Sequence, residues 1–384
     1  MILSDVCEFI VDCPHSTAPD EGKGYPLIRT PNVGKGRLDL NGVHRVSESV
    51  YKQRIQRGSP RANDLIFARE APAGNVALVQ ENQTVCLGQR TVLIRPNVQK
   101  VNPQYLVYYL LSPKPQYELL GTANGATVAH VNLPAIRNLK IELPEKFVQD
   151  KIGTILVTYD DLIENNQKQI KLLEEAAQRL YKEWFVDLRF PGHENTKIVD
   201  GVPEGWKKER LVDIAEIQYG YAFDGTLFNA DKNGTPIIRI RNIPQAETMD
   251  YTTEHVSENY LVQNGEIIVG MDGEFHINAW AGNTAYLVQR VCCIRPKNPA
   301  MKGWMLQAIY EPIKFFERTV VGATVAHLGK KHLDSIYLLT SPEGFYEPFK
   351  NFFDKRLLLM NQNRKLREAR DRLLPKLMSG EAEV

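Results

Sequence analysis

The chain has 384 residues, of which 43% are hydrophobic and 24% are charged. This composition is typical of a globular protein with two or three cores, and it excludes a mainly disordered chain. Forty-seven Lys and Arg residues against 46 Asp and Glu leave a formal charge of +1. Affinity for nucleic acid would therefore depend on local basic patches or on partners.

Membrane association and disulfide bonds are not expected. Apolar runs such as residues 106–111 are far shorter than the roughly 18 residues of a membrane span, and residues 1–5 lack the layout of a signal peptide. We therefore expect a cytoplasmic protein. The five cysteines form an odd number without a Cys-x-x-Cys pair, which predicts reduced thiols and no structural metal.

The chain contains an internal duplication with a period of about 200 residues. The strongest match is the hexapeptide Gly-Ala-Thr-Val-Ala-His, which occurs at residues 125–130 and again at 322–327. Because solenoid units repeat every 20 to 50 residues or so, each copy must be a domain with its own connector.

The first part of each copy is predicted to be a mixed α/β domain. Short apolar segments bounded by turn residues predict strands at 64–68 and 91–94, whereas residues 103–111 and 301–316 predict helices. The two predicted domains span residues 1–144 and 203–342.

The remainder of each copy, at 145–190 and 343–378, is predicted to be a long helix with a heptad seam that pairs with the other. Asn166 and Gln362, about 196 residues apart, are expected to correspond and to fix the register, although an exposed helix turn is the alternative. Pro375 is expected to end or kink the second helix. The predicted pairing residues are Ile152, Leu156, Ile163, Asn166, Ile170, Leu173 and Leu180 in the first helix and Leu359, Gln362, Leu366 and Leu373 in the second.

Sequence motifs for catalysis are missing. There is no phosphate-binding loop, no dinucleotide fingerprint, no His-Glu-x-x-His and no Asn/Asp-Pro-Pro-Tyr loop for holding a flipped adenine. Residues 19–23 contain Pro-Asp followed by a glutamate and a lysine, but these residues lie too close together in the sequence to form a nuclease site around a metal. The repeated His130 and His327 lack a nucleophile or metal ligand at readable spacing, so we favour a structural role for them. The remaining class of function is ligand recognition without catalysis. Two copies of a domain on a rigid spacer suit a ligand with two sites, such as duplex DNA.

Three segments carry a resemblance to a known family: Leu-Tyr-Lys-Glu-Trp-Phe-Val-Asp at 180–187, Pro-Glu-Gly-Trp-Lys at 203–207, and residues 373–381. With the duplication, the chain resembles the specificity (S) subunit of a Type I restriction-modification enzyme over essentially its whole length. The first copy departs from the pattern, because it starts at Leu3 without a counterpart of residues 203–206. We expect a truncated or minimal N-terminus.

The resemblance implies two α/β target recognition domains, each reading one half of a bipartite DNA sequence. It also implies that the two helices form an antiparallel coiled coil with pseudo-two-fold symmetry, which sets the gap and docks two modification subunits. The subunit is then not catalytic: S-adenosylmethionine and ATP with Mg²⁺ are expected on the modification and restriction subunits. Three alternatives remain: an orphan S-like protein that sequesters modification subunits, a coiled-coil adaptor without a DNA role, and an independent methyltransferase or nuclease, which the missing motifs disfavour.

Base-reading residues are expected where the two copies diverge, because two domains that read different half-sites share a scaffold and differ at their contacts. Arg90 and Arg290 are shared, and are expected to hold phosphates or strands in place. The divergent candidates are His15, Ser16, Thr17, Lys35, Arg37, Arg69, Glu70 and Asn75 in the first domain and Tyr219, Tyr221, Arg241, Asp272, Glu274, His276 and Asn278 in the second.

Overall fold

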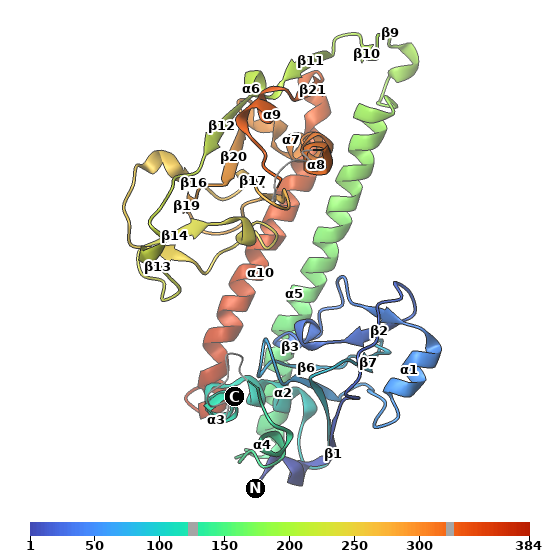
Figure 1. Ribbon diagram of the computed structural model, residues 1–384, viewed down its shortest axis with the longest axis vertical. Helices are drawn as coiled ribbons and strands as arrows, with labels where there is room; N and C mark the ends of the chain where they lie inside the picture. Colours follow the sequence, from blue (N-terminus) through green and yellow to red (C-terminus); the bar gives the residue numbers. More distant parts are fainter. Residues whose placement is uncertain (122–129, 320–325) are drawn as a thin grey trace. The chain divides into compact units, whose positions relative to one another are not determined.

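A computed structural model describes residues 1–121, 130–319 and 326–384. Its contacts divide the chain into two units. Unit 1 comprises Met1–Glu164 and Leu366–Val384, and unit 2 comprises Asn165–Lys365. Each unit therefore contains one copy of the duplicated domain together with a segment of each long helix (Figure 1). Within the described ranges, no helix is long and apolar enough to cross a membrane.

The domain of unit 1 contains two sheets (Figure 1). The predicted strands at 64–68 and 91–94 are confirmed as two neighbouring inner strands of the larger sheet. In sheet order, the larger sheet consists of β1 (Cys7–Asp12), β8 (Thr91–Pro96), β5 (Leu65–Ala68), β6 (Val76–Leu78) and β3 (Gly36–Arg37), and the smaller one of β4 (Arg45–Val46), β2 (Tyr25–Ile28) and β7 (Cys86–Leu87).

The domain of unit 2 repeats this topology. The order β12-β20-β17-β18 reproduces β1-β8-β5-β6, and the parallel pair β14 and β19 reproduces β2 and β7. The first sheet consists of β12 (Ala215–Tyr219), β20 (Val291–Pro296), β17 (Ile267–Gly270) and β18 (Ile277–Ala279), and the second of β13 (Phe228–Asn229), β15 (Tyr251–Thr252), β14 (Thr235–Ile238), β19 (Ala285–Leu287) and β16 (Leu261–Val262). Two further pairs are β9 (Ile198–Val199) with β10 (Val202–Pro203) and β11 (Lys207–Arg210) with β21 (Tyr337–Thr340).

Short helices cover the sheets. The predicted helix at 103–111 is confirmed as α2, and Asn102 caps it by accepting a hydrogen bond from the Tyr105 amide at 3.0 Å. The predicted helix at 301–316 is instead two helices, because Pro312 has no amide hydrogen and fits only the first turn of a new helix. The helices are α1 (Glu48–Arg54), α2 (Pro103–Leu111), α3 (Pro113–Gly121) and α4 (Leu133–Arg137) in unit 1, and α6 (Leu211–Ile214), α7 (Lys302–Ala308), α8 (Tyr310–Thr319) and α9 (Lys330–Asp334) in unit 2.

The two long helices are α5 (Lys146–Tyr181), which a π turn at Lys182–Val186 continues, and α10 (Glu347–Ser379). Pro375 lies inside α10 and does not end it. In unit 2, Asn166 of α5 hydrogen-bonds Asn363 of α10, and Glu174 pairs with Arg356. As the residue number increases along α5, the number of its partner in α10 decreases. These two segments therefore run antiparallel.

The predicted role of Gln362 in the seam is wrong. Gln362 is exposed, whereas Asn363 is buried and its Oδ1 accepts a hydrogen bond from Asn166 Nδ2 at 2.9 Å. These residues are 197 positions apart, one more than the expected offset. One residue rotates a helical side chain by about 100°, out of the seam. Among the other predicted seam residues, Ile152, Leu156, Ile163 and Leu359 are buried, and Ile170, Leu173, Leu180, Leu366 and Leu373 are half-buried.

The long helices complete the core of each unit. In unit 1, Ile152, Leu156 and Leu377 belong to the same buried cluster as the sheet and α2. In unit 2, Phe349 of α10 belongs to the cluster of Trp304. The five cysteines all lie in the described part of the chain and are free thiols. Burial raises the pKa of Cys86 to about 12, so this thiol stays protonated at neutral pH.

Candidate nucleic-acid interface

Each unit brings an arginine, a carboxylate and a histidine together at equivalent positions. We call these three residues the Arg-acid-His cluster. They are Arg90, Glu70 and His130 in unit 1, and Arg290, Asp272 and His327 in unit 2. Residues 125–129 and 322–325 of the repeated hexapeptide lie outside the described residues, but the histidine that ends it is described in both copies.

The cluster of unit 1 rests on a mostly buried ion pair between Arg69 and Asp12. Glu70 Oε1 lies 2.7 Å from His130 Nδ1 and 2.9 Å from a terminal nitrogen of Arg90. Arg69 Nη2 lies 2.9 Å from His130 Nε2, and Arg69 Nη1 donates to Asp12 Oδ2 at 2.6 Å. The histidine is therefore held on both ring nitrogens.

In unit 2 the cluster has the same three members but a different support. His327 Nδ1 lies 2.5 Å from Asp272 Oδ1, and Arg290 Nε lies 3.3 Å from Asp272 Oδ2. Met271 occupies the position that Arg69 has in unit 1, one residue before the carboxylate. The unit 2 histidine therefore has no guanidinium from that position.

The same backbone hydrogen bonds position both clusters. The Arg69 amide donates to the Arg90 carbonyl at 2.9 Å, and the Val131 amide donates to the Arg69 carbonyl at 2.9 Å. In unit 2, Met271 and Leu328 repeat these bonds to Arg290 and Met271 at 2.8 and 2.7 Å.

Arg90 and Arg290 both adopt left-handed backbone conformations, with φ values of 64° and 71°. Such angles are uncommon for residues other than glycine and cluster at functional sites. Their recurrence at equivalent positions shows that the duplicated scaffold imposes this turn in both domains.

The arginines present the cation of each cluster to solvent. The Arg90 and Arg290 side chains are both 54% exposed, whereas Glu70 and Asp272 are both 28% exposed. A guanidinium held in this way can donate to a phosphate oxygen or to a base edge. Among the described residues, no group of three or more His, Cys, Asp or Glu side chains could hold a metal ion.

Several predicted contact residues lie at or near these clusters. In unit 1, His15 Nε2 lies 3.5 Å from Asp12, the partner of Arg69. In unit 2, the Tyr221 carbonyl accepts a hydrogen bond from the amide of Gln289, the neighbour of Arg290. The remaining predicted residues that are exposed are Ser16, Thr17, Lys35, Arg241 and Glu274, and the half-buried ones are Tyr219 and His276.

Arg69 and Asn278 are buried, and the prediction that they contact bases is wrong. Arg69 is 9% exposed and is taken up by its bonds to Asp12 and His130. Asn278 is 8% exposed; its amide donates to the Ile243 carbonyl and its oxygen accepts from Arg356. Buried side chains of this kind cannot reach a base edge.

Two further candidates make internal contacts. Arg37 pairs with Asp161 on α5. Asn75 donates to the Val33 carbonyl at 2.9 Å. These contacts hold both side chains against other residues of unit 1.

Exposed Arg241 pairs with Asp250. Burial raises the pKa of Asp250, but hydrogen bonds from Arg241 and Asn242 outweigh this effect and bring the pKa below its usual value. Burial raises the pKa of Tyr219 to about 12, so its hydroxyl remains a donor at neutral pH.

Sequence reasoning missed Asp12 and the two histidines as members of these sites. The signal was present: the histidine and the arginine are identical in the two copies, and the acid is retained as Glu70 or Asp272. Each cluster is assembled from three segments far apart in the sequence, which no local spacing reveals.

Comparison with known proteins identifies the family. A model of the Type I restriction modification DNA specificity domain matches residues 1–175 and 203–341. The Type I restriction enzyme MjaIX specificity subunit of Methanocaldococcus jannaschii is 27% identical over 362 residues, covering 89% of this chain and 83% of the relative. The HindI specificity subunit of Haemophilus influenzae is 21% identical over 407 residues, covering 86% and 88%.

Among solved structures, the S subunit of a Type I restriction-modification system from M. genitalium has a similar fold. Its TM-score is 0.56 at 15% sequence identity, and the match covers 98% of this chain and 95% of that chain. The family match falls on both copies of the duplication and spans most of the sequence. This chain therefore belongs to the Type I restriction-modification DNA specificity family.

Proposed function

We propose that this chain is the DNA-recognition subunit of a Type I restriction-modification complex, and that each domain reads one half of a bipartite, gapped target. The observation that carries the proposal is the Arg-acid-His cluster, which recurs at equivalent places in two domains of the same topology. A repeated cation on a repeated scaffold suits a ligand whose backbone also repeats, as that of duplex DNA does.

Within each domain, residues shared by the two copies contact phosphates, and residues that differ between the copies read bases. Arg90 and Arg290 contact phosphates, because they are identical in the two copies and half of each side chain is exposed. Exposed or half-buried side chains that differ between the copies read base edges. In this proposal the base-reading candidates are His15, Ser16, Thr17 and Lys35 in unit 1 and Arg241, Glu274 and His276 in unit 2.

The helices α5 and α10 set the gap between the half-sites and dock two modification subunits. Their antiparallel contacts in unit 2 support this role, since a rigid pair of helices can fix a distance. Insertion of one heptad into both helices should lengthen the gap and leave both half-sites unchanged. S-adenosylmethionine would bind to the modification subunits, and ATP with Mg²⁺ to the restriction subunits. Because the chain carries a net charge of only +1, it should bind DNA weakly without them.

The test is a DNA titration of the complex assembled with its modification subunits. Arg90→Ala and Arg290→Ala should each weaken binding to all sequences alike and reduce the slope of log K against log salt by about 0.9. Arg61→Ala, at an exposed arginine that pairs with Glu8, is the matched control and should change neither quantity. If neither cluster variant alters DNA affinity, the proposed interface is wrong, and sequestration of modification subunits becomes the better account.

A further inference from the structure

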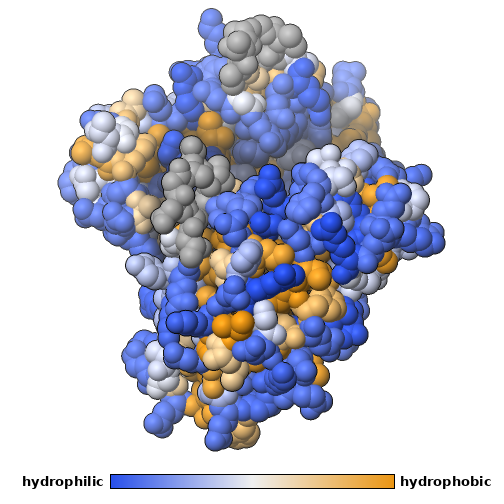
Figure 2. All heavy atoms as spheres, turned by 60° about the horizontal axis from the view of Figure 1, so that its bottom comes forward, coloured by the Kyte–Doolittle hydropathy of each residue, from blue (hydrophilic) through white to orange (hydrophobic). Residues whose placement is uncertain are grey.

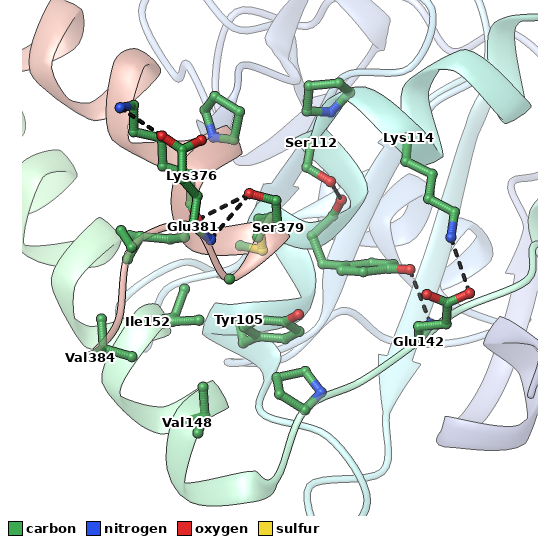
Figure 3. Close-up of a pocket in the computed structure, with 18 of the residues that line it drawn as sticks. Tyr105, Ser112, Lys114, Glu142, Val148, Ile152, Lys376, Ser379, Glu381 and Val384 are labelled. Atoms are coloured by element: carbon green, nitrogen blue, oxygen red, sulfur yellow. Dashed lines mark hydrogen bonds and ion pairs between the residues drawn. The ribbon is translucent and has the colours of Figure 1, made fainter.

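Unit 1 contains a cavity of about 1070 Å³ between α2, the first turns of α5 and the last residues of the chain (Figure 3). Figure 2 shows apolar side chains gathered among polar ones where this part of the molecule comes forward. Two ion pairs lie at the cavity, Lys114 with Glu142 at 3.1 Å and Lys376 with Glu381 at 3.0 Å. These contacts do not specify a ligand, whereas the loop after β1 is held by specific contacts beside the Arg-acid-His cluster.

This loop, at residues 13–18, follows β1 directly. The polar side chains at positions 15–17 are exposed. His15 Nε2 lies 3.5 Å from Asp12 Oδ2, the same oxygen that accepts a hydrogen bond from Arg69. The loop therefore presents three polar side chains to solvent next to residues that support the cluster of unit 1.

A proline marks the point where the chain leaves the sheet. The Cys13 amide donates to the first residue of β8, and the Gly220 amide donates to the first residue of β20. The residues that follow, Pro14 and Tyr221, are therefore equivalent. In unit 2, the Tyr221 amide donates to the Leu287 carbonyl at 2.8 Å and keeps the chain beside β19. Proline has no amide hydrogen and cannot make this bond, so the unit 1 loop is held by other donors.

Side chains supply these donors, and they reach three successive carbonyls of the loop. The donors are Arg57 Nη1 to the Cys13 carbonyl at 3.1 Å, Arg54 Nη1 to the Pro14 carbonyl at 3.5 Å and Gln89 Nε2 to the His15 carbonyl at 3.3 Å. We call Arg54, Arg57 and Gln89 the carbonyl clamp. Arg54 is the last residue of α1, and Gln89 directly precedes Arg90 of the cluster. The clamp therefore ties the loop to α1 and to the turn that carries the exposed arginine.

These contacts fix the loop before DNA is bound. Arg54 is 5% exposed, and hydrogen bonds from an ionised donor are stronger than neutral ones. At the other end of the loop, Ala18 packs against the buried cluster that contains Leu27 and Val46. Fixing the backbone in advance lowers the conformational entropy that binding would cost. The loop therefore suits base reading, which requires side chains in defined positions.

We propose that the carbonyl clamp sets the sequence specificity of unit 1, because it positions the side chains at 15–17 so that they meet base edges in the major groove. The clamp donates to carbonyls of the loop and not to DNA. It therefore acts on sequence discrimination and leaves the phosphate contact of Arg90 in place. Unit 2 has backbone pairing at Tyr221 instead, so reading of its half-site does not depend on the clamp. This inference rests on the proposed function.

The test measures DNA binding by the full chain assembled with its modification subunits. The probes are duplexes that carry the bipartite motif and each of its single-base variants. Replacement of residues 15–17 together by alanine should remove discrimination at one or more positions of one half-site only. Arg57→Leu and Gln89→Leu should each lower discrimination at these same positions about fivefold, which is the lower end of the usual effect of a mismatched base pair. Discrimination in the other half-site and the slope of log K against log salt should not change.

Two further variants separate positioning from a general effect on the fold. Arg57→Lys keeps a donor and should retain more discrimination than Arg57→Leu. Lys52→Leu, at an exposed lysine of α1 that pairs with Glu48, is the matched control and should leave discrimination unchanged. Circular dichroism would verify that each variant folds.

Several outcomes would overturn the proposal. If the alanine replacement leaves discrimination intact, the side chains at 15–17 do not read bases. If it relaxes one half-site but Arg57→Leu and Gln89→Leu do not, the clamp does not position the loop. Equal weakening of all duplexes by the clamp variants would show an effect on general affinity and contradict the assignment. A complex that shows no sequence preference before any substitution would instead contradict the proposed function, and this inference with it.

Discussion

The two units share a topology but support their Arg-acid-His clusters differently. In unit 1 the histidine is held between Glu70 and Arg69, and Arg69 itself rests on Asp12. In unit 2 Met271 stands at the Arg69 position and contributes no charge. The common part is the left-handed arginine and its backbone hydrogen bonds. The duplicated scaffold therefore fixes the position of the exposed arginine, while the residues that support its cluster differ between the units.

The units also differ in how the start of the long helix is covered. Aromatic residues from 184–206 cover this surface in unit 2, whereas a cavity remains in unit 1. The linker between the copies is therefore part of the unit 2 core. The stability of unit 2 should therefore depend on the linker.

The largest effect is expected from Trp206→Ala. This indole is 6% exposed and packs against Phe185, Phe190 and Phe345, so its removal should lower the free energy of unfolding by about 3 to 5 kcal/mol. Hydrogen exchange should rise in unit 2 and not in unit 1. Phe147→Ala, at an exposed site in unit 1, is the control and should change stability by less than about 0.5 kcal/mol. A loss below 1 kcal/mol or so for Trp206→Ala would contradict the assigned core role.

The next effect concerns the polar contacts in the helix seam. In unit 1, Arg370 pairs with Asp160, which is 3% exposed and also accepts a hydrogen bond from Tyr108 at 2.5 Å. Arg370→Met leaves this carboxylate buried without its cation and should cost about 3 to 5 kcal/mol in urea denaturation.

In unit 2, the polar contact between the long helices is a neutral pair, Asn166 with Asn363. Asn166→Leu should therefore cost less, about 1 to 3 kcal/mol. Equal losses for Arg370→Met and Asn166→Leu would show that the ion pair contributes no more than the amide pair.

A smaller effect should distinguish the two clusters in DNA binding. Arg69→Met gives unit 1 the residue that unit 2 has, and it frees His130 Nε2 from its partner. We expect about tenfold weaker binding, or about 1.4 kcal/mol, for DNA carrying the unit 1 half-site, measured with the assembled complex. Base changes in the unit 2 half-site should lower the DNA affinity of Arg69→Met by the same factor as that of the unchanged protein. Equal weakening by Arg69→Met for DNA with and without the unit 1 half-site would contradict the division between units.

The smallest effect is a pH dependence in unit 2. The pKa of Asp250 is lowered in the folded state, so its carboxylate stabilises unit 2 above the pKa of the unfolded chain, about 3.9, and this contribution disappears as the pH falls through the folded pKa. Asp250→Asn should therefore destabilise the protein by less than about 1 kcal/mol at pH 7, because Arg241 is mostly exposed. The difference should shrink under acidic conditions. In unit 1, Asn32 donates instead to the main-chain carbonyl of Asp39.

Much of the fold could be predicted from the sequence. The duplication, the strands around 64–68 and 91–94, the helix at 103–111 and the buried positions Ile152 and Leu156 all follow from patterns that repeat or alternate. The position of Gln362 could not be predicted, because loops of different length shift the offset between the copies, and a shift of one residue moves a side chain out of the seam.

The candidate site was less predictable. Divergence between the copies drew attention to Arg69 and Asn278, but a single sequence does not show that both are buried. The three members of each cluster come from separate segments that only the folded sheet brings together. The shared Arg90 and Arg290 were predicted to hold phosphates or strands in place, and Glu70 and Asp272 were also named as candidates. The pairing of these residues with each other and with the histidines appears only in three dimensions.

The central claim is that two equivalent domains direct a complex to one bipartite DNA sequence. The most direct measurement is a single-molecule map of methylated bases in genomic DNA from cells with and without this gene. The account predicts that adenine methylation at one gapped, two-part motif disappears without the gene, and that Arg90→Ala or Arg290→Ala reduces methylation at that motif. An unchanged methylation map in cells that express the modification subunits would contradict it.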